Sequence, residues 1–64
     1  MQNMKQAKAV ASLIESGKET TIYLMNGYQM HGVIEESDDA VVIIKTYKGR
    51  QMVYAHAIST INID

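Results

Sequence analysis

Two acidic pairs and two histidines are the groups in this 64-residue chain that could perform acid–base chemistry. They are Glu35, Glu36, Asp38, Asp39, His31 and His56. Catalysis needs a nucleophile, a base and a group that orients the base, and the sequence shows no such set. Paired carboxylates beside a turn are usually solvated charge, and no glycine-rich phosphate loop is present. We therefore expect a protein that is not an enzyme, with no small-molecule substrate and no cofactor.

A second group of side chains suits the stacking and pairing of nucleic-acid bases. Tyr23 and Tyr28 offer flat rings, and Met30 offers a polarisable wall. Gln51 carries an amide that can pair with a base edge. The alternative is ordinary packing of Tyr23, Tyr28 and Met30 on a half-buried hairpin, which composition alone favours.

One short helix and five short strands must position these side chains. Apolar residues recur at helical spacing before Gly17, which is a natural stop signal. β-Branched and aromatic residues follow and predict strands. We expect a helix over about 3–16 and strands over about 20–25, 28–36, 40–46, 51–55 and 58–63. The chain would be a single domain over 1–64, mainly β, with an N-terminal helix before a strongly bent five-stranded antiparallel barrel.

Local signals add detail to this barrel. Asn26-Gly27 is the strongest short-range signal for a two-residue hairpin turn with positive φ at both positions. Gly32 predicts a sharp bend or bulge in the second strand. Residues 40–44 are continuously apolar, as expected of a strand covered on both faces. Open edges aggregate unless paired, so pairing the fourth strand with the fifth strand of a neighbouring subunit would close a ring.

Size and charge narrow the class of protein. A chain this short buries only about 60% of its unfolded surface, and the usual remedies are disulfides, a metal or burial against other subunits. Without Cys and with two His, no disulfide or structural metal site is expected, which leaves oligomerisation. A net charge of −1 argues against binding driven by a basic surface but not against base stacking in pockets. No run approaches the roughly 18 apolar residues of a membrane span, and the absence of Cys is compatible with the cytoplasm.

Two blocks of the chain resemble the two Sm motifs of Hfq, the bacterial Sm-like (LSm) RNA chaperone family. They read IYLMNGYQMHGVIEESD and QMVYAHAIST, and the predicted helix precedes them as in that family. The second block is close to a signature of bacterial members. The resemblance covers about residues 20–60. It implies a cytoplasmic homohexameric ring that binds RNA and acts with small regulatory RNAs in post-transcriptional regulation and the stress response.

The resemblance also implies a distal face, opposite the helices, that takes purine-rich and especially adenine-rich single-stranded RNA between neighbouring subunits. An aromatic residue after the glycine, followed by Gln-Met, looks like the Gram-positive version of this face. The matching positions are Tyr23, Asn26, Gly27, Tyr28, Gln29, Met30, Gln51 and Thr60.

On the helix-bearing proximal face, the family binds uridine-rich RNA ends around its pore. Gln6, Tyr54 and His56 match family positions there, and His56 would reach a phosphate or ribose oxygen. Each of these three residues also has an alternative, purely structural role. His56 could shape the corner before the last strand, Tyr54 could hold the subunit seam, and Gln6 could be an ordinary exposed helix residue.

Several departures from the family pattern weaken the expected proximal face. Ala55 replaces the pore lysine, Ala40 replaces the uracil-stacking aromatic, and Ala7 replaces an aspartate near the helix start. Losing a stacking ring costs roughly 1–3 kcal/mol per base. The family's arginine-rich rim is reduced to Lys18 near Glu15. We therefore expect weak binding of uridine-rich RNA and doubtful annealing activity. The alternative function is a Sm-fold oligomer with little RNA affinity that acts through protein contacts.

Overall fold

Helix α1 spans Met4–Ser16 in the computed structural model, which describes residues 4–63. Val10 and Leu13, three positions apart and on one helical face, are buried in the core. Gly17 ends the helix in the left-handed region at φ +65°, and its N–H donates to the Leu13 carbonyl oxygen at 3.1 Å. The helix expected over 3–16 is therefore found, with residue 3 outside the described part. Among the described residues, no helix is both long and apolar enough to cross a membrane.

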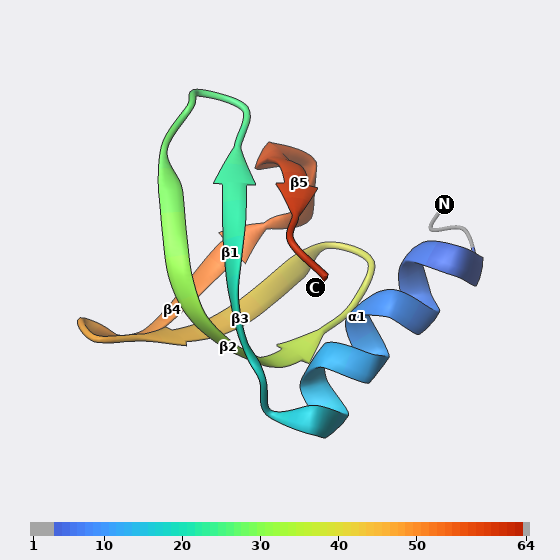
Figure 1. Ribbon diagram of the computed structural model, residues 1–64. Helices are drawn as coiled ribbons and strands as arrows, with labels where there is room; N and C mark the ends of the chain where they lie inside the picture. Colours follow the sequence, from blue (N-terminus) through green and yellow to red (C-terminus); the bar gives the residue numbers. More distant parts are fainter. Residues whose placement is uncertain (1–3, 64) are drawn as a thin grey trace.

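Five antiparallel strands form one sheet in the order β4-β3-β2-β1-β5 (Figure 1). A 3₁₀ turn over Ala55–Ala57 joins β4 to β5, at the corner expected around His56. The strands are β1 Glu19–Leu24, β2 Gln29–Ser37, β3 Val41–Thr46, β4 Gly49–Tyr54 and β5 Ile58–Ile61. The mainly β class predicted from the sequence, with a helix followed by five antiparallel strands, is confirmed. The sheet curls strongly but stays open, so β4 and β5 are its two edges.

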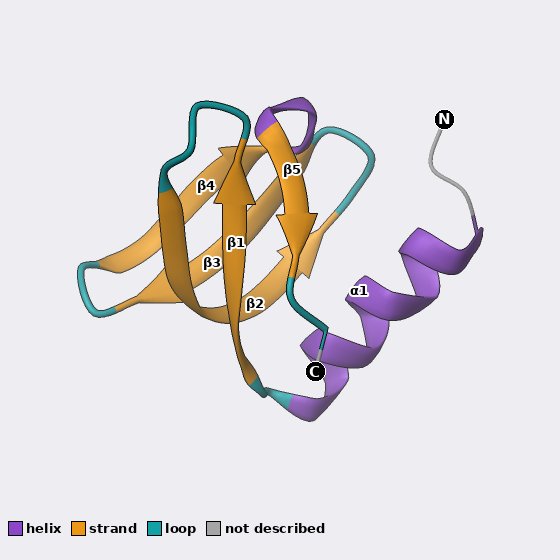
Figure 2. Cartoon of the chain, turned by 45° about the horizontal axis from the view of Figure 1, so that its top comes forward, coloured by secondary structure: helices purple, strands orange, loops and turns teal. Residues whose placement is uncertain are grey.

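The core fills the inside of this curl. Ile22, Ile34 and Ile44, from the three central strands, have no exposed surface. Helix α1 contacts β2 and closes one side of the core with its apolar stripe (Figure 2). The complete buried cluster is Val10, Leu13, Ile22, Ile34, Val42, Ile44 and Val53.

Strand β2 bends because it pairs with two different strands along its length. Its first half pairs with β1 and its second half with β3, and Val33 has a partner in each. The sequence predicted a sharp bend or a bulge at Gly32, and no bulge lies there. A Cβ at Gly32 would overlap the backbone carbonyl of Lys45, so glycine permits a close approach of β2 to β3. The bulge lies two to three residues later, where the register shifts between Ile34 and Glu36.

The first hairpin also differs from its prediction. Of Asn26 and Gly27, Gly27 alone has a positive φ, +88°. The Gly27 N–H donates to the Leu24 carbonyl at 2.9 Å, and the Leu24 N–H donates to the Tyr28 carbonyl at 2.8 Å. The loop is therefore three residues long, with glycine at its left-handed last position, a common alternative to the two-residue turn. Asn26 avoids the left-handed region, and its side chain instead accepts the Tyr28 N–H at 2.9 Å.

The strand ends and the apolar run differ from expectation in smaller ways. Ala40 lies in a turn before β3, because its N–H donates to the Asp38 carboxylate at 2.8 Å. The β4 strand starts two residues earlier than expected, at Gly49, and β5 ends at Ile61. In the apolar run, Val42 and Ile44 are buried but the alternate residues are half-buried, so one face of β3 is not fully covered within this chain.

Candidate nucleic-acid interface

The expected distal residues on β1, β2 and β5 form a row across the sheet. Tyr23 lies directly opposite Gln29 on one side and Thr60 on the other. Directly opposed residues of antiparallel strands point to the same face, roughly 5 Å apart. Gln29 and Thr60 are exposed and Tyr23 is half-buried. The fold therefore brings one aromatic ring and two polar side chains together on one surface.

The β1–β2 loop presents a second ring beside this row. The Tyr28 side chain is 55% exposed. Its backbone is held on both sides, because its N–H donates to Asn26 and its carbonyl accepts from Leu24. Asn26 and Gly27 thus stabilise the loop conformation, Asn26 through its side-chain oxygen and Gly27 through its positive φ. The loop holds the Tyr28 backbone in place while leaving much of its ring open to solvent.

Four expected distal residues line one hollow of about 610 Å³, which we call the distal hollow. Met30 forms part of its wall and also packs against the core. The Thr46 hydroxyl donates to the Gln51 side-chain oxygen at 3.2 Å, which leaves the amide NH₂ as a donor. The lining residues are Glu19, Tyr28, Gln29, Met30, His31, Gly32, Val33, Lys45, Thr46, Tyr47, Lys48 and Gln51. Gln29 belongs to both the row and the hollow and connects them.

The expected proximal residues lie around the 3₁₀ turn. The Tyr54 and His56 rings stack with centroids 5.7 Å apart and planes inclined by 28°. Two of the departures from the family pattern, Ala40 and Ala55, are neighbours, because the Ala55 N–H donates to the Ala40 carbonyl at 2.8 Å. Gln6 lies in α1, but its side chain is outside the described part of the chain, as is that of Ala7.

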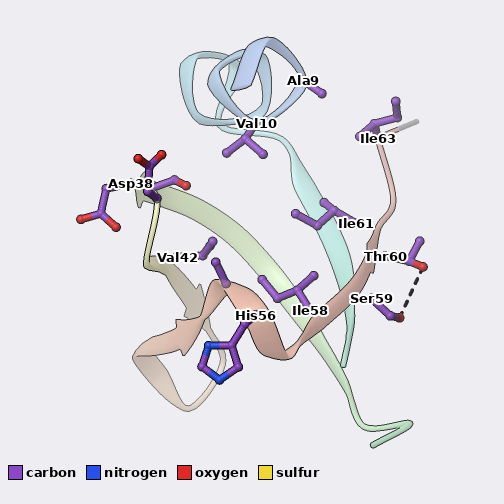
Figure 3. A pocket seen from close by; sticks show the side chains of 13 residues that line it. Ala9, Val10, Asp38, Val42, His56, Ile58, Ser59, Thr60, Ile61 and Ile63 are labelled. Carbon is purple, nitrogen blue, oxygen red and sulfur yellow. Dashed lines mark hydrogen bonds between the residues drawn. The ribbon is translucent and has the colours of Figure 1, made fainter. Parts of the chain in front are cut away.

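Beside this turn, a second hollow is bordered by His56, Ser59 and the two aspartates of the β2–β3 turn (Figure 3). We call it the acidic hollow. Asp38 accepts the backbone N–H groups of Val41, at 2.9 Å, and of Ala40, at 2.8 Å. These bonds, that from Val41 foremost, hold the pKa of Asp38 below its ordinary value. The carboxylate is therefore charged at neutral pH, and it would repel an RNA phosphate that came close to it.

The other candidates for acid–base chemistry are engaged in surface contacts. Arg50 binds Glu35 at 2.7 Å and Glu36 at 3.2 Å. The bulge brings these consecutive carboxylates within reach of the same guanidinium. His31 contacts Glu19 at 3.3 Å and Thr21 at 3.0 Å. Over residues 4–63, no group of three or more His, Asp or Glu side chains is placed to hold a metal ion.

The expected rim carries little positive charge. Glu15 and Lys18 are exposed near the end of α1, and Gly17 separates Lys18 from the helix. Lys8, about two helical turns before Glu15, is exposed as well. These dispersed lysines do not form the arginine-rich cluster that the resemblance would call for.

Comparison with known proteins settles the family. The family model described as Hfq protein matches residues 5–64. The chain belongs to the Hfq family. It is 36% identical over 55 residues to the RNA-binding protein Hfq of Geobacillus sp. (strain WCH70), a match covering 86% of this chain and 74% of that protein. The RNA-binding protein Hfq of Bacillus thuringiensis (strain Al Hakam) is 45% identical over 40 residues, covering 62% of this chain and 54% of its own.

A solved structure agrees in fold. A 1.55 Å crystal structure of the pleiotropic translational regulator Hfq superposes with a TM-score of 0.88 at 39% sequence identity, covering 92% of this chain and 98% of that one. The predicted Hfq resemblance, including the Gram-positive character suggested by the sequence between Gly27 and Met30, agrees with these Bacillaceae relatives.

Sequence reasoning overlooked part of the distal hollow. His31, Lys45, Tyr47 and Lys48 border it together with the expected residues of the Hfq distal face. Tyr47 and Lys48 lie in the turn between β3 and β4, and Lys45 is an exposed residue of β3. A signal was available, since three of the six Lys and Arg residues fall within residues 45–50.

Proposed function

We propose that this chain is a subunit of a cytoplasmic homohexameric ring that binds adenine-rich or other purine-rich single-stranded RNA on its distal surface. The ring would act in post-transcriptional regulation with small regulatory RNAs. The observation that carries the proposal is the distal hollow, where Tyr28, Met30 and Gln51 surround a space of about 610 Å³. Membership in the Hfq family, whose relatives are named RNA-binding proteins, supports RNA as the ligand.

Base stacking is the expected main source of affinity. Six subunits would carry about six times −1, or −6 formal charges, which repels RNA at long range. Exposed rings on a preformed surface can still hold bases, because stacking contributes roughly 1–3 kcal/mol per base. Tyr28 supplies an exposed ring and Tyr23 a half-buried one, and Gln29, Gln51 and Thr60 are exposed and can meet base edges or ribose oxygens.

Weak binding of uridine-rich RNA is expected at the proximal face. The adjoining positions Ala40 and Ala55 lack the stacking ring and the cation that the family places there. His56 and Tyr54 remain as possible contacts, with the carboxylates of Asp38 and Asp39 in the neighbouring acidic hollow. If oligoadenine and oligouridine both failed to bind, the function would instead be that of a Sm-fold oligomer acting through protein contacts.

Ring formation is supported by the two unpaired edges of the sheet. β4 and β5 are the outermost strands, and β4 exposes Met52 at 53% and Tyr54 at 55%. Pairing β4 with the β5 strand of the next subunit would cover both edges. The mass in solution tests this directly. Six chains of 7.1 kDa should give about 43 kDa, whereas a stable monomer at high micromolar concentration would contradict the ring.

Replacement of Tyr28 tests the RNA site. Because 55% of the Tyr28 side chain is exposed, Tyr28→Ala should fold normally. It should weaken oligoadenine binding by roughly 5- to 150-fold, the equivalent of about 1–3 kcal/mol of lost stacking. Tyr28→Phe keeps the ring and is the matched control that should bind like the original chain. Equal affinity of all three proteins would remove the distal hollow from the RNA-binding surface.

A further inference from the structure

The β3–β4 hairpin concentrates the positive charge of a chain that is otherwise acidic. Lys45, Lys48 and Arg50 are three of the six cations in the sequence, and no Asp or Glu occurs from residue 40 to residue 63. The carboxylates of Glu35 and Glu36 neutralise Arg50. Among the described residues, Lys45 and Lys48 form no salt bridge. These two ammonium groups are therefore available to an anionic ligand.

At the tip of the same hairpin stands a tyrosine that the fold does not use for packing. The Tyr47 side chain is 93% exposed, so it buries almost no apolar surface. The Lys48 ammonium lies over the ring, 5.7 Å from its centroid, on one face. The other face of the ring is free to stack against a flat group. An aromatic ring beside a lysine matches a nucleotide, with its flat base and anionic phosphate.

The tip is also held in one conformation. Tyr47 and Lys48 occupy the turn between the paired residues Thr46 and Gly49. The Thr46 hydroxyl accepts the Lys48 N–H at 3.1 Å and lies 3.3 Å from the Gly49 carbonyl oxygen. Gly49 completes the turn at φ +110°. A turn that is already fixed loses little conformational entropy when a ligand binds.

The tip borders the surface proposed for RNA. Tyr47, Lys48 and Lys45 line the distal hollow together with Tyr28 and Gln51. Thr46 links them, since its hydroxyl also contacts the Gln51 side-chain oxygen at 3.2 Å. Glu19 is a carboxylate on the same rim and is engaged by His31 at 3.3 Å. A strand bound along this hollow would meet both Tyr28 and the tip.

We propose that Tyr47 and Lys48 form an additional contact for single-stranded nucleic acid, with a base stacked on Tyr47 and a neighbouring phosphate held by Lys48 and Lys45. The inference rests on the proposed function and extends it, because it carries the bound strand from the expected distal positions out to the hairpin tip. In Figure 1 this hairpin projects on the side of the molecule away from α1. The contact would give an acidic chain a local site for phosphate.

A single tryptophan makes the contact visible. The chain has no Trp, so Tyr47→Trp places one fluorophore at the tip. Stacking of a base should quench its fluorescence during titration with oligoadenine. The quenching should saturate at the same concentration as the anisotropy of a labelled oligoadenine. Ser12→Trp, at an exposed position on α1, is the matched control and should show no quenching.

Affinity measurements complete the test. Tyr47→Ala should weaken oligoadenine binding by roughly 5- to 150-fold, and Tyr47→Phe should not. Lys48→Gln should make the salt dependence shallower by about 0.7 in log–log slope for each phosphate lost.

Two results would overturn the tip contact and leave the proposed function standing. In the first, RNA binds with unchanged affinity to the Tyr47 variants, and the fluorescence of the Tyr47→Trp variant does not change on titration. In the second, Tyr47→Ala alters the mass in solution but not RNA affinity, which would make the tip a subunit contact. Failure of the unaltered chain to bind any RNA would refute both proposals.

Discussion

Restoring the two missing side chains of the proximal face should restore uridine binding. The perturbation is Ala40→Phe combined with Ala55→Lys. The two positions adjoin, because the Ala55 N–H donates to the Ala40 carbonyl at 2.8 Å. Ala40 is exposed and its backbone already sits in a fixed turn, so a ring added there meets solvent rather than the core. A gain of affinity is informative because a misfolded protein would not produce it.

The magnitude follows from what each side chain adds. One stacked base should contribute roughly 1–3 kcal/mol per subunit, or about 5- to 150-fold in affinity for a short oligouridine. A lysine at position 55 should add about 0.7 to the log–log salt slope for each phosphate contacted. The charged Asp38 in the neighbouring acidic hollow opposes that phosphate, so the lower half of the range is expected.

Fluorescence anisotropy of labelled oligouridine, at two salt concentrations, measures both effects. Ala40→Leu with Ala55→Gln is the matched control, since it adds bulk without a ring or a charge. The double variant should bind more tightly than this control and more tightly than the unaltered chain. Equal affinity of all three would mean that Ala40 and Ala55 are not what weakens the proximal face, and the reasoning from them would be wrong.

Two further predictions concern stability. Gly32→Ala should lower the free energy of unfolding by about 1–3 kcal/mol in urea titration. Its Cβ would lie 2.9 Å from the Lys45 carbonyl carbon and 3.2 Å from the Thr46 Cα, so β2 and β3 must separate. An unchanged midpoint of urea unfolding would show that the two strands can separate at no cost in stability. Asp38→Asn should destabilise the protein at neutral pH, because hydrogen bonds from Val41 and Ala40 lower the folded pKa of Asp38 below its ordinary value of 3.8. A carboxylate whose pKa is lower in the folded than in the unfolded chain stabilises the folded protein at pH values above the unfolded pKa. This stabilisation is lost as the pH falls through the folded pKa. The difference from the unaltered chain should therefore shrink below about pH 4, and a pH-independent difference, or the same loss in Asp39→Asn, would contradict the assignment.

The order and type of the elements could be predicted because the sequence pattern and the fold agree there. The apolar stripe that contains Val10 and Leu13 has helical spacing, and Gly17 stands where a left-handed cap is needed. The conformations of the turns were harder to predict, because they depend on which of several competing hydrogen bonds form. Asn-Gly fits a two-residue turn, yet the Asn26 side chain bonds the Tyr28 N–H and the loop takes a third residue. A glycine in a strand can mean a bulge or a close approach, and Gly32 serves the second.

The candidate site was predictable in part, through the resemblance to the Hfq family rather than through periodicity. That resemblance named Tyr28, Gln29, Met30 and Gln51, which the fold gathers in one hollow. It could not name Tyr47, because a turn residue carries no pattern that says which surface it will border. Only the curl of the sheet places the β3–β4 turn on the same hollow that Tyr28, just before β2, also lines.

The central claim is that this chain binds purine-rich RNA by stacking on its distal surface. Side-by-side titrations of the unaltered protein with oligoadenine and oligouridine of equal length, over a range of salt concentrations, test it most directly. The expected result is tighter binding of oligoadenine than of oligouridine, with a log–log salt slope of at most about 0.7 for each hairpin tip that holds a phosphate. Nanomolar binding of oligouridine at physiological salt, or an oligoadenine slope steeper than this, would contradict it.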